Sequence, residues 1–192
     1  IEEAKKSKYI DRLILSSEDS EIIKVAIEWG CEVPFVRPSE LARDDTPSIE
    51  LVIHAINTLN EKYDYIVLLQ PTSPLRTVED IDCCIELCIC SNALSCVSVV
   101  EVNQHPNWMF KINSKGKIEH YEKNEIKCSR QQLPTLYMLN GAVYVANTDF
   151  LIKHKSFLHE DTHAYIMPPN RSIDVDSELD LAFTELLKTH NC

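Results

Sequence analysis

The fold is decided by the stretch from Tyr65 to Thr77, which reads YIVLLQPTSPLRT. Its apolar start has no polar face, which is typical of a parallel strand covered by helices on both sides. A polar loop with two prolines follows, and Thr77 is placed to cap the next helix. Ligands in open α/β sheets bind beyond the carboxyl ends of the strands, so Gln70 and Thr72 are candidate binding residues. A loop that only turns the chain would contain the same residue types, and both interpretations stay open.

On both sides of this stretch, strand-like and helix-like patterns alternate. Short apolar runs predict strands at 13–15, 33–36, 95–102, 142–145 and 164–167. Helices are expected between them, one of them ended by Gly30, with a final helix over 177–188. The alternation predicts a single α/β domain over 1–192, with a mainly parallel sheet and helices on both faces.

The stretch 103–138 breaks this alternation. It is polar, has no clear period, and contains Gly116 in a turn-like NSKGK sequence. We interpret it as an insertion that contains a hairpin, not as a second domain.

The amino-acid composition limits the classes of molecule that this protein is expected to bind. The chain has 19 basic and 30 acidic residues and a net charge of −11. This balance argues against binding to nucleic acid or to an anionic membrane, whereas a small anionic ligand needs only a local cationic pocket. The chain opens without an apolar signal segment, so we expect its eight cysteines to be reduced and the protein to be cytoplasmic. Four of them lie in 83–90 without a CxxC spacing, which favours a buried helix face over a metal site.

Asp174 and Asp176 are the pair of residues in the sequence that most clearly suggests a chemical role. A short strand is expected at 172–176, and residues i and i+2 of a strand point to one face. Two convergent carboxylates suit Mg²⁺, which commonly takes one or two of them together with substrate phosphates. Alternatively, one carboxylate caps the final helix. Upstream, Arg130 is suited to a bidentate contact with a carboxylate or phosphate, or to a surface ion pair.

Several ordered segments resemble one family, the CMP-N-acetylneuraminic acid synthetases, also called acylneuraminate cytidylyltransferases. The segments that carry the resemblance are RPSELA at 37–42, LLQPTSPLRT at 68–77, RQQLP at 130–134, NGAVY at 140–144 and SIDVDSELDL at 172–181. The resemblance implies a Rossmann-like nucleotidyltransferase fold with an inserted dimerisation arm. It also implies a reaction in which CTP and a nine-carbon keto sugar acid give the CMP-sugar and pyrophosphate.

The resemblance also implies roles for single residues. Carried over by position, the cytosine pocket would contain Arg37 and Ser48. The sugar would be held by Gln70, Thr72, Arg130, Asn140 and Tyr144. The catalytic group would be Gln70 with Asp174 and Asp176, and these two aspartates would bind Mg²⁺. Family members are homodimers, so Phe157 and Leu158 would line the partner's sugar pocket.

Two departures from the family pattern leave questions open. The family begins with a strand and a basic glycine-containing loop that grips the triphosphate, and this sequence starts after it. The three glycines here are too far apart to form such a loop, so we expect an N-terminally incomplete chain that is not a competent synthetase alone. His105-Pro106 is followed by Asn107-Trp108 where some sialic-acid members have a lysine, which leaves the sugar open. N-acetylneuraminate is the first choice, and the alternatives are legionaminate, pseudaminate, KDO, or a non-catalytic binding homologue.

Overall fold

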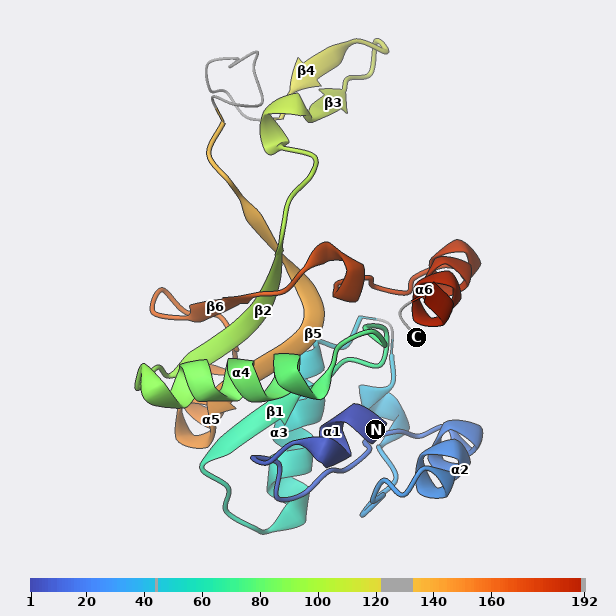
Figure 1. Ribbon diagram of the computed structural model, residues 1–192, viewed down its shortest axis with the longest axis vertical. Coiled ribbons are helices and arrows are strands. Elements are labelled where there is room, and N and C mark those ends of the chain that lie inside the picture. The colour runs from blue at the N-terminus through green and yellow to red at the C-terminus, as the bar shows by residue number, and fades with distance from the viewer. Residues whose placement is uncertain (44, 122–132, 191–192) are drawn as a thin grey trace.

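A four-stranded sheet forms the centre of the protein (Figure 1). The computed structural model describes residues 1–43, 45–121 and 133–190. The strands lie in the order β1-β5-β2-β6. Their bounds are β1 Tyr65–Leu68, β2 Ser95–Glu101, β5 Tyr137–Asn147 and β6 His163–Ile166. β2 pairs with β6 in parallel, and β5 runs antiparallel to both β1 and β2. The α/β class is therefore confirmed, with three strands that run one way and one reversed strand between them.

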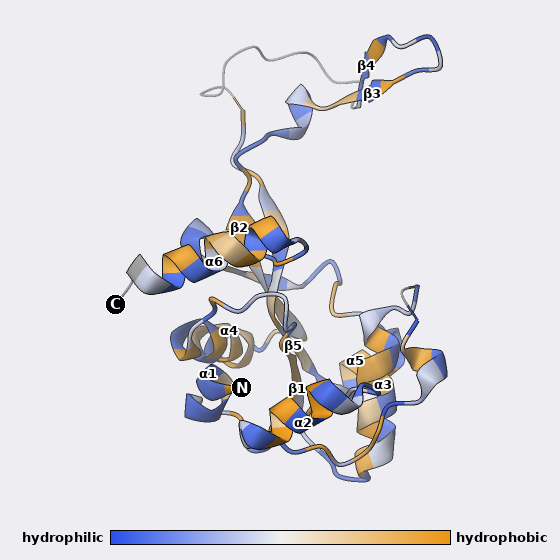
Figure 2. Cartoon of the chain, turned by 90° about the vertical axis from the view of Figure 1, so that its right-hand side faces the viewer, coloured by the Kyte–Doolittle hydropathy of each residue, from blue (hydrophilic) through white to orange (hydrophobic). Residues whose placement is uncertain are grey.

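Helices cover both faces of the sheet. Their bounds are α1 Glu2–Lys6, α2 Ser20–Glu28, α3 Ser48–Leu59, α4 Val78–Cys90, α5 Thr148–His154 and α6 Glu178–His190. Figure 2 shows α1 and α4 on one side of β5, and α3 and α5 on the other. β5 contributes to a hydrophobic core on each side of the sheet. Val143 and Val145 pack in the cluster with α4, and Ala146 packs in the cluster with α3 and α5. This alternation explains why the strand is apolar on both faces.

The expected local signals at the helix ends are present. Thr77 and Asp80 form a capping box at the start of α4. Asp19 caps α2 by accepting from the backbone N–H groups of Glu21 and Ile22. Gly30 follows α2 with φ +72°, in the left-handed region that favours glycine.

Two of the four cysteines of α4 lie on its buried face, so the expected buried face is confirmed in part. Cys84 and Cys88 are fully buried, whereas Cys83 and Cys90 are exposed. The Cys84 thiol lies 3.5 Å from that of Cys96 on β2, and all three buried thiols are free. In the described ranges, no cysteine belongs to a group of potential metal ligands.

Three expected strands differ from the structure. The run 13–15 contributes only one isolated bridge, from Ile14 to Glu32, and the run 33–36 forms neither a strand nor a bridge. The segment 172–176 is in neither a strand nor a helix, because its backbone neighbour is the loop residue Thr72 and not a strand. Asp174 and Asp176 are both exposed, with half-buried Val175 between them, but the expected strand at 172–176 is not formed.

We call the stretch 103–138 the arm; its described residues, 103–121 and 133–138, project beyond the sheet where β2 and β5 extend from it (Figure 1). In its described part, a turn of 3₁₀ helix at Pro106–Trp108 leads into β3 Phe110–Ile112 and β4 Ile118–His120. These two strands pair antiparallel, and Gly116 lies in the turn with φ +73°. The expected hairpin is present, and its Ile112 and Ile118 side chains are exposed.

In the described part of the chain, no helix has the length and apolar character needed to cross a membrane.

Candidate active site

Three segments meet beyond the carboxyl ends of β1 and β6. They are the loop 70–76 after β1, the start of β5, and the segment 172–176 after β6. The Val175 N–H donates to the Thr72 carbonyl at 2.8 Å. Ser73 Oγ donates to the Asn140 carbonyl at 3.1 Å, and Asn140 Nδ2 donates to Ser172 Oγ at 2.9 Å. The structure therefore brings together the candidate residues of all three segments, at the edge where ligands bind in such sheets.

Asp174 and Asp176 present their side chains to solvent, and Val175 between them is half-buried. Among the contacts of the described residues, neither carboxylate accepts a hydrogen bond, so both are available to a ligand. Asp174 lies near Tyr144 of β5: burial raises the pKa of the Tyr144 hydroxyl, and the charge of Asp174 raises it further. Two exposed carboxylates two positions apart in the chain are a donor set that fits Mg²⁺, which completes its shell with water and substrate phosphate.

Gln70 is held over the backbone of β5. A Cβ atom on Gly141 would lie 2.5 Å from Gln70 Oε1 and 3.2 Å from Ser73 Oγ. Gly141 also has φ +74°, so this position requires glycine both for space and for backbone conformation. The Gln70 side-chain amide makes no hydrogen bond to another described residue. It is free to bind a ligand hydroxyl or carboxylate.

Arg76 provides a positive charge beneath the same loop. Its Nη1 donates to the Gln70 carbonyl at 2.5 Å and to the Ala142 carbonyl at 3.1 Å. Burial lowers the pKa of the Arg76 guanidinium to about 10, so the group stays cationic at neutral pH. No carboxylate pairs with it in the described part of the chain, which leaves its charge to act on the site.

Asn140 is enclosed by protein groups. Its side chain is 4% exposed and donates to Ser172 Oγ and to Met167 Sδ. Its Oδ1 accepts from Ser98 Oγ at 2.6 Å and from the Ala142 N–H at 3.2 Å. An asparagine amide offers two donors and two acceptor sites, and all four are taken here. The family resemblance implied that Asn140 holds the sugar. In the structure Asn140 lies at the site, but its amide forms hydrogen bonds to other residues of the chain.

Two other candidates, Arg37 and Ser48, make no hydrogen bond to this group among the described contacts. Arg37 pairs with Glu18, with Nε 2.8 Å from Oε2. Ser48 is exposed at the first position of α3. Among the described contacts, none joins Arg37 or Ser48 to the loop 70–76. Arg130 lies outside the described residues.

The two residues expected at a partner's pocket differ in exposure. Phe157 is 7% exposed and packs within its own subunit, with its ring centroid 5.5 Å from that of Tyr144. Leu158 is 50% exposed. Leu158 is therefore the member of the pair that is available to contact a second molecule.

The sequence analysis missed Asp80 and Arg171. Asp80 accepts two hydrogen bonds from Arg171, with Nε–Oδ2 2.9 Å and Nη2–Oδ1 2.8 Å. The spacing Thr77-x-x-Asp80 before an apolar run was a capping-box signal that could have identified the acid. Nothing in the sequence pairs it with an arginine 91 residues later.

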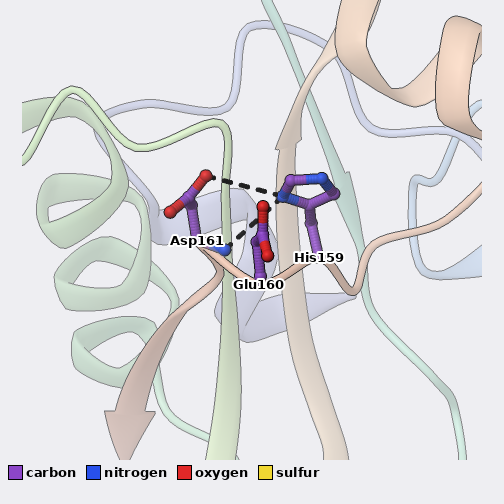
Figure 3. A group of neighbouring side chains, drawn as sticks. All are labelled: His159, Glu160 and Asp161. Atoms are coloured by element: carbon purple, nitrogen blue, oxygen red, sulfur yellow. Dashed lines mark hydrogen bonds and ion pairs between the residues drawn. The ribbon is translucent and has the colours of Figure 1, made fainter.

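A separate group of potential metal ligands lies in the turn before β6 (Figure 3). His159, Glu160 and Asp161 are consecutive and exposed, and their ligand atoms lie within 4.8 Å of one another. His159 Nδ1 is 3.6 Å from Asp161 Oδ2. Such exposed groups are common without a metal, and among the described residues no hydrogen bond or ion pair joins this one to the candidate active site.

Comparisons with known proteins agree on one family. The family model for cytidylyltransferases matches residues 1–188. The CMP-N,N'-diacetyllegionaminic acid synthase of Legionella pneumophila is 32% identical, over 98% of this chain and 82% of that protein. An N-acylneuraminate cytidylyltransferase of Streptococcus agalactiae is 32% identical, over 87% of this chain and 40% of that protein. The structure of a CMP:2-keto-3-deoxy-manno-octonic acid synthetase complexed with CTP shares the fold. It has a TM-score of 0.70 at 12% identity and covers all of this chain and 86% of that one.

Proposed function

Because this chain belongs to the cytidylyltransferase family, we propose that it transfers CMP from CTP to a nine-carbon 2-keto sugar acid and releases pyrophosphate. The observation that carries the proposal is the pair of solvent-facing carboxylates, Asp174 and Asp176, beside the loop that holds Gln70. This arrangement lies at the carboxyl ends of β1 and β6, and it combines two carboxylates that could hold a cation with an amide that bonds to no other described residue.

The sugar acid that we favour is of the diacetyllegionaminate type. The legionaminic acid synthase matches nearly the whole of this chain and most of its own length, whereas the N-acylneuraminate enzyme matches over less of both at the same identity. N-acetylneuraminate, the first choice from the sequence, is the second candidate, and that equal identity supports it.

In this proposal the chain's own residues mainly position the reactants. Asp174 and Asp176 would hold Mg²⁺, which neutralises developing phosphate charge. The Gln70 amide, with both a donor and an acceptor, orients the hydroxyl or carboxylate of the sugar acid. Arg76 holds the Gln70 carbonyl in place and adds a positive charge behind it. A hydroxyl held in line with the α-phosphorus needs little more than alignment and loss of its proton.

We also propose that the protein is a homodimer in which the arm contacts the second subunit. The exposed apolar side chains of the hairpin, Ile112 and Ile118, support this role, as does the exposed Leu158. Size-exclusion chromatography with light scattering tests this, and a monomer at micromolar concentration would contradict it.

The experiment that tests the reaction is pyrophosphate release from CTP, measured in the native protein with a panel of sugar acids. The panel contains N,N'-diacetyllegionaminate, N-acetylneuraminate, pseudaminate and KDO. We expect the highest kcat/KM with diacetyllegionaminate. No turnover with any of these acids would refute the proposed function, and a preference for N-acetylneuraminate would replace the favoured substrate with the second candidate.

The proposed metal site is tested by Asp174→Asn and Asp176→Asn. Each should lower turnover by at least about a hundredfold, since a metal contact is worth several kcal/mol. Neither should change the unfolding midpoint, because both side chains are exposed and accept no hydrogen bond from a described residue. Asp64→Asn is the matched control: Asp64 is exposed before β1, at the opposite end of the strand. Full activity in both site variants would show that these carboxylates do not bind the metal.

A further inference from the structure

Asp80 is a buried carboxylate that makes more contacts than a helix cap requires. Its side chain is 0% exposed. Oδ2 accepts from the Thr77 N–H at 2.9 Å, and Thr77 Oγ1 accepts from the Asp80 N–H at 3.4 Å, and these two bonds complete the capping box. The same group also accepts the two-bond contact from Arg171 and a hydrogen bond from the Tyr165 hydroxyl at 3.3 Å. One carboxylate therefore joins the start of α4, strand β6 and the turn that ends at Arg171.

The charges of this pair balance each other inside the protein. Burial alone would raise the pKa of Asp80, but the hydrogen bonds from Arg171 and Thr77 outweigh it and lower the pKa below its usual value. Asp80 is therefore ionised at neutral pH and depends on its partner, since an unpaired buried charge is costly. Two parallel N–H···O bonds also fix the direction of the guanidinium plane, which a single ammonium contact would not do.

Arg171 is joined directly to the segment that carries the metal-site candidates. It ends the 3₁₀ turn Pro169–Arg171, three positions before Asp174. Residues 172–176 belong to no helix or strand, so no ladder of hydrogen bonds fixes their backbone. Two described contacts join the segment to the rest of the site: the Val175 N–H donates to the Thr72 carbonyl, and Ser172 Oγ accepts from Asn140 Nδ2. The Ser172 N–H and hydroxyl also donate to the Pro169 and Pro168 carbonyls, so the start of the segment is tied to the turn that Arg171 ends.

We propose that Asp80 and Arg171 are positioning residues, which hold segment 172–176 against loop 70–76 so that Asp174 and Asp176 face the same reacting centre as Gln70. The proposal rests on the proposed function. The short loop that ends at Thr77 makes two connections to this part of the chain. The Thr72 carbonyl accepts from the Val175 N–H. The Thr77 N–H donates to Asp80, and Asp80 binds Arg171, the residue just before the segment. These two connections set the distance between the Gln70 amide and the carboxylates of Asp174 and Asp176.

The test uses Arg171→Gln, since Arg171 is 30% exposed at its side chain and its replacement leaves the Thr77–Asp80 capping box in place. We expect amide hydrogen exchange at Val175 to become roughly tenfold faster, because the segment opens locally more often. We expect kcat to fall by about 10- to 100-fold while KM for CTP changes by less than about threefold, because small misplacements cost mainly alignment. Arg171→Lys, which keeps the charge but not the two-bond geometry, should restore part of kcat.

Two further variants make the outcome decisive. Glu79→Gln removes one exposed negative charge beside Asp80 on α4 and should behave as the native protein in exchange and in kcat. Asp80→Asn combined with Arg171→Gln removes both buried charges, so the test can still be made if Arg171→Gln alone leaves Asp80 unpaired and unfolds. The double variant should show the same rapid exchange and low kcat.

Three results separate this inference from the proposed function. Unchanged Val175 exchange in folded Arg171→Gln or in the double variant would overturn the inference. Faster exchange with native kcat would overturn it as well, because the ion pair would then be structural only. Inactivity of the native protein toward every sugar acid of the panel would instead refute the proposed function.

Discussion

Replacing Asn140 with alanine separates a structural amide from a sugar-binding one. The change removes the acceptor of two buried donors, the Ser98 hydroxyl and the Ala142 N–H. Ser98 and Ala142 are both fully buried, so water does not readily replace the lost partner. Each unpaired buried donor costs about 1–3 kcal/mol, which gives about 2–6 kcal/mol for the pair. That loss is a large part of the about 5–15 kcal/mol that stabilises a typical domain.

The matched control is Gln70→Ala, which removes another amide at the same site. Gln70 is half-buried, and its side chain makes no hydrogen bond to a described residue. Its removal should therefore change the free energy of unfolding by less than about 1 kcal/mol. It should instead raise KM for the sugar acid by roughly tenfold to a hundredfold, as expected when a ligand loses one well-placed hydrogen bond.

Urea unfolding followed by circular dichroism, together with steady-state kinetics, compares the two variants. We expect Asn140→Ala to shift the midpoint strongly at an unchanged slope, and Gln70→Ala to shift only the sugar KM. The reasoning is refuted if Asn140→Ala is within about 0.5 kcal/mol of the native protein while its sugar KM rises. In that case the Asn140 amide would contact the sugar, as the family resemblance implies, and the internal contacts would contribute little.

Three smaller predictions follow from the same region. Gly141→Ala should cost about 1–2 kcal/mol through its positive φ and, by displacing Gln70 Oε1, should raise the sugar KM; a native KM would show that Gln70 does not bind the sugar. Thr77→Ala should lower stability by about 1 kcal/mol in urea unfolding through loss of the cap, and an unchanged midpoint would contradict this. Asp80 has a lowered pKa, so its contribution is present above about pH 4 and is lost as pH falls through the folded value. Asp80→Asn should therefore show a weaker acid dependence of stability than the native protein, and equal slopes would contradict the pairing with Arg171.

The sequence predicted the features that depend on neighbouring residues. The capping residue Thr77, the positive φ of Gly30 and the hairpin turn at Gly116 all follow from local chemistry, and all are present. The two-faced apolar strand at β1 was also found, because burial on both faces leaves a continuous apolar run. These signals do not depend on how distant segments pair.

Features that depend on distant pairing were not predictable. The runs 13–15 and 33–36 are apolar enough for strands, but the first forms only one bridge, at Ile14, and the second forms none. The ion pair of Asp80 and Arg171 joins residues that no spacing rule connects. The enclosed state of Asn140 likewise depends on Ser98 and Ser172, which come from two other elements. A single sequence does not show which of its many polar residues will contact one another in the folded protein.

The reversed direction of β5 explains why residues at the beginning of a strand belong to this site. β1, β2 and β6 run the same way, so their carboxyl ends form one edge of the sheet. β5 runs against them, so its first half lies at that edge, with Tyr144 opposite Leu68 at the end of β1. A parallel strand would have placed the Asn140–Gly141 pair at the far edge. The two amides also differ in their surroundings. Gln70 follows β1 and lies half-buried over Gly141, with no hydrogen bond from its amide to another described residue. Asn140 begins the buried part of β5 and is enclosed between Ser98 and Ser172.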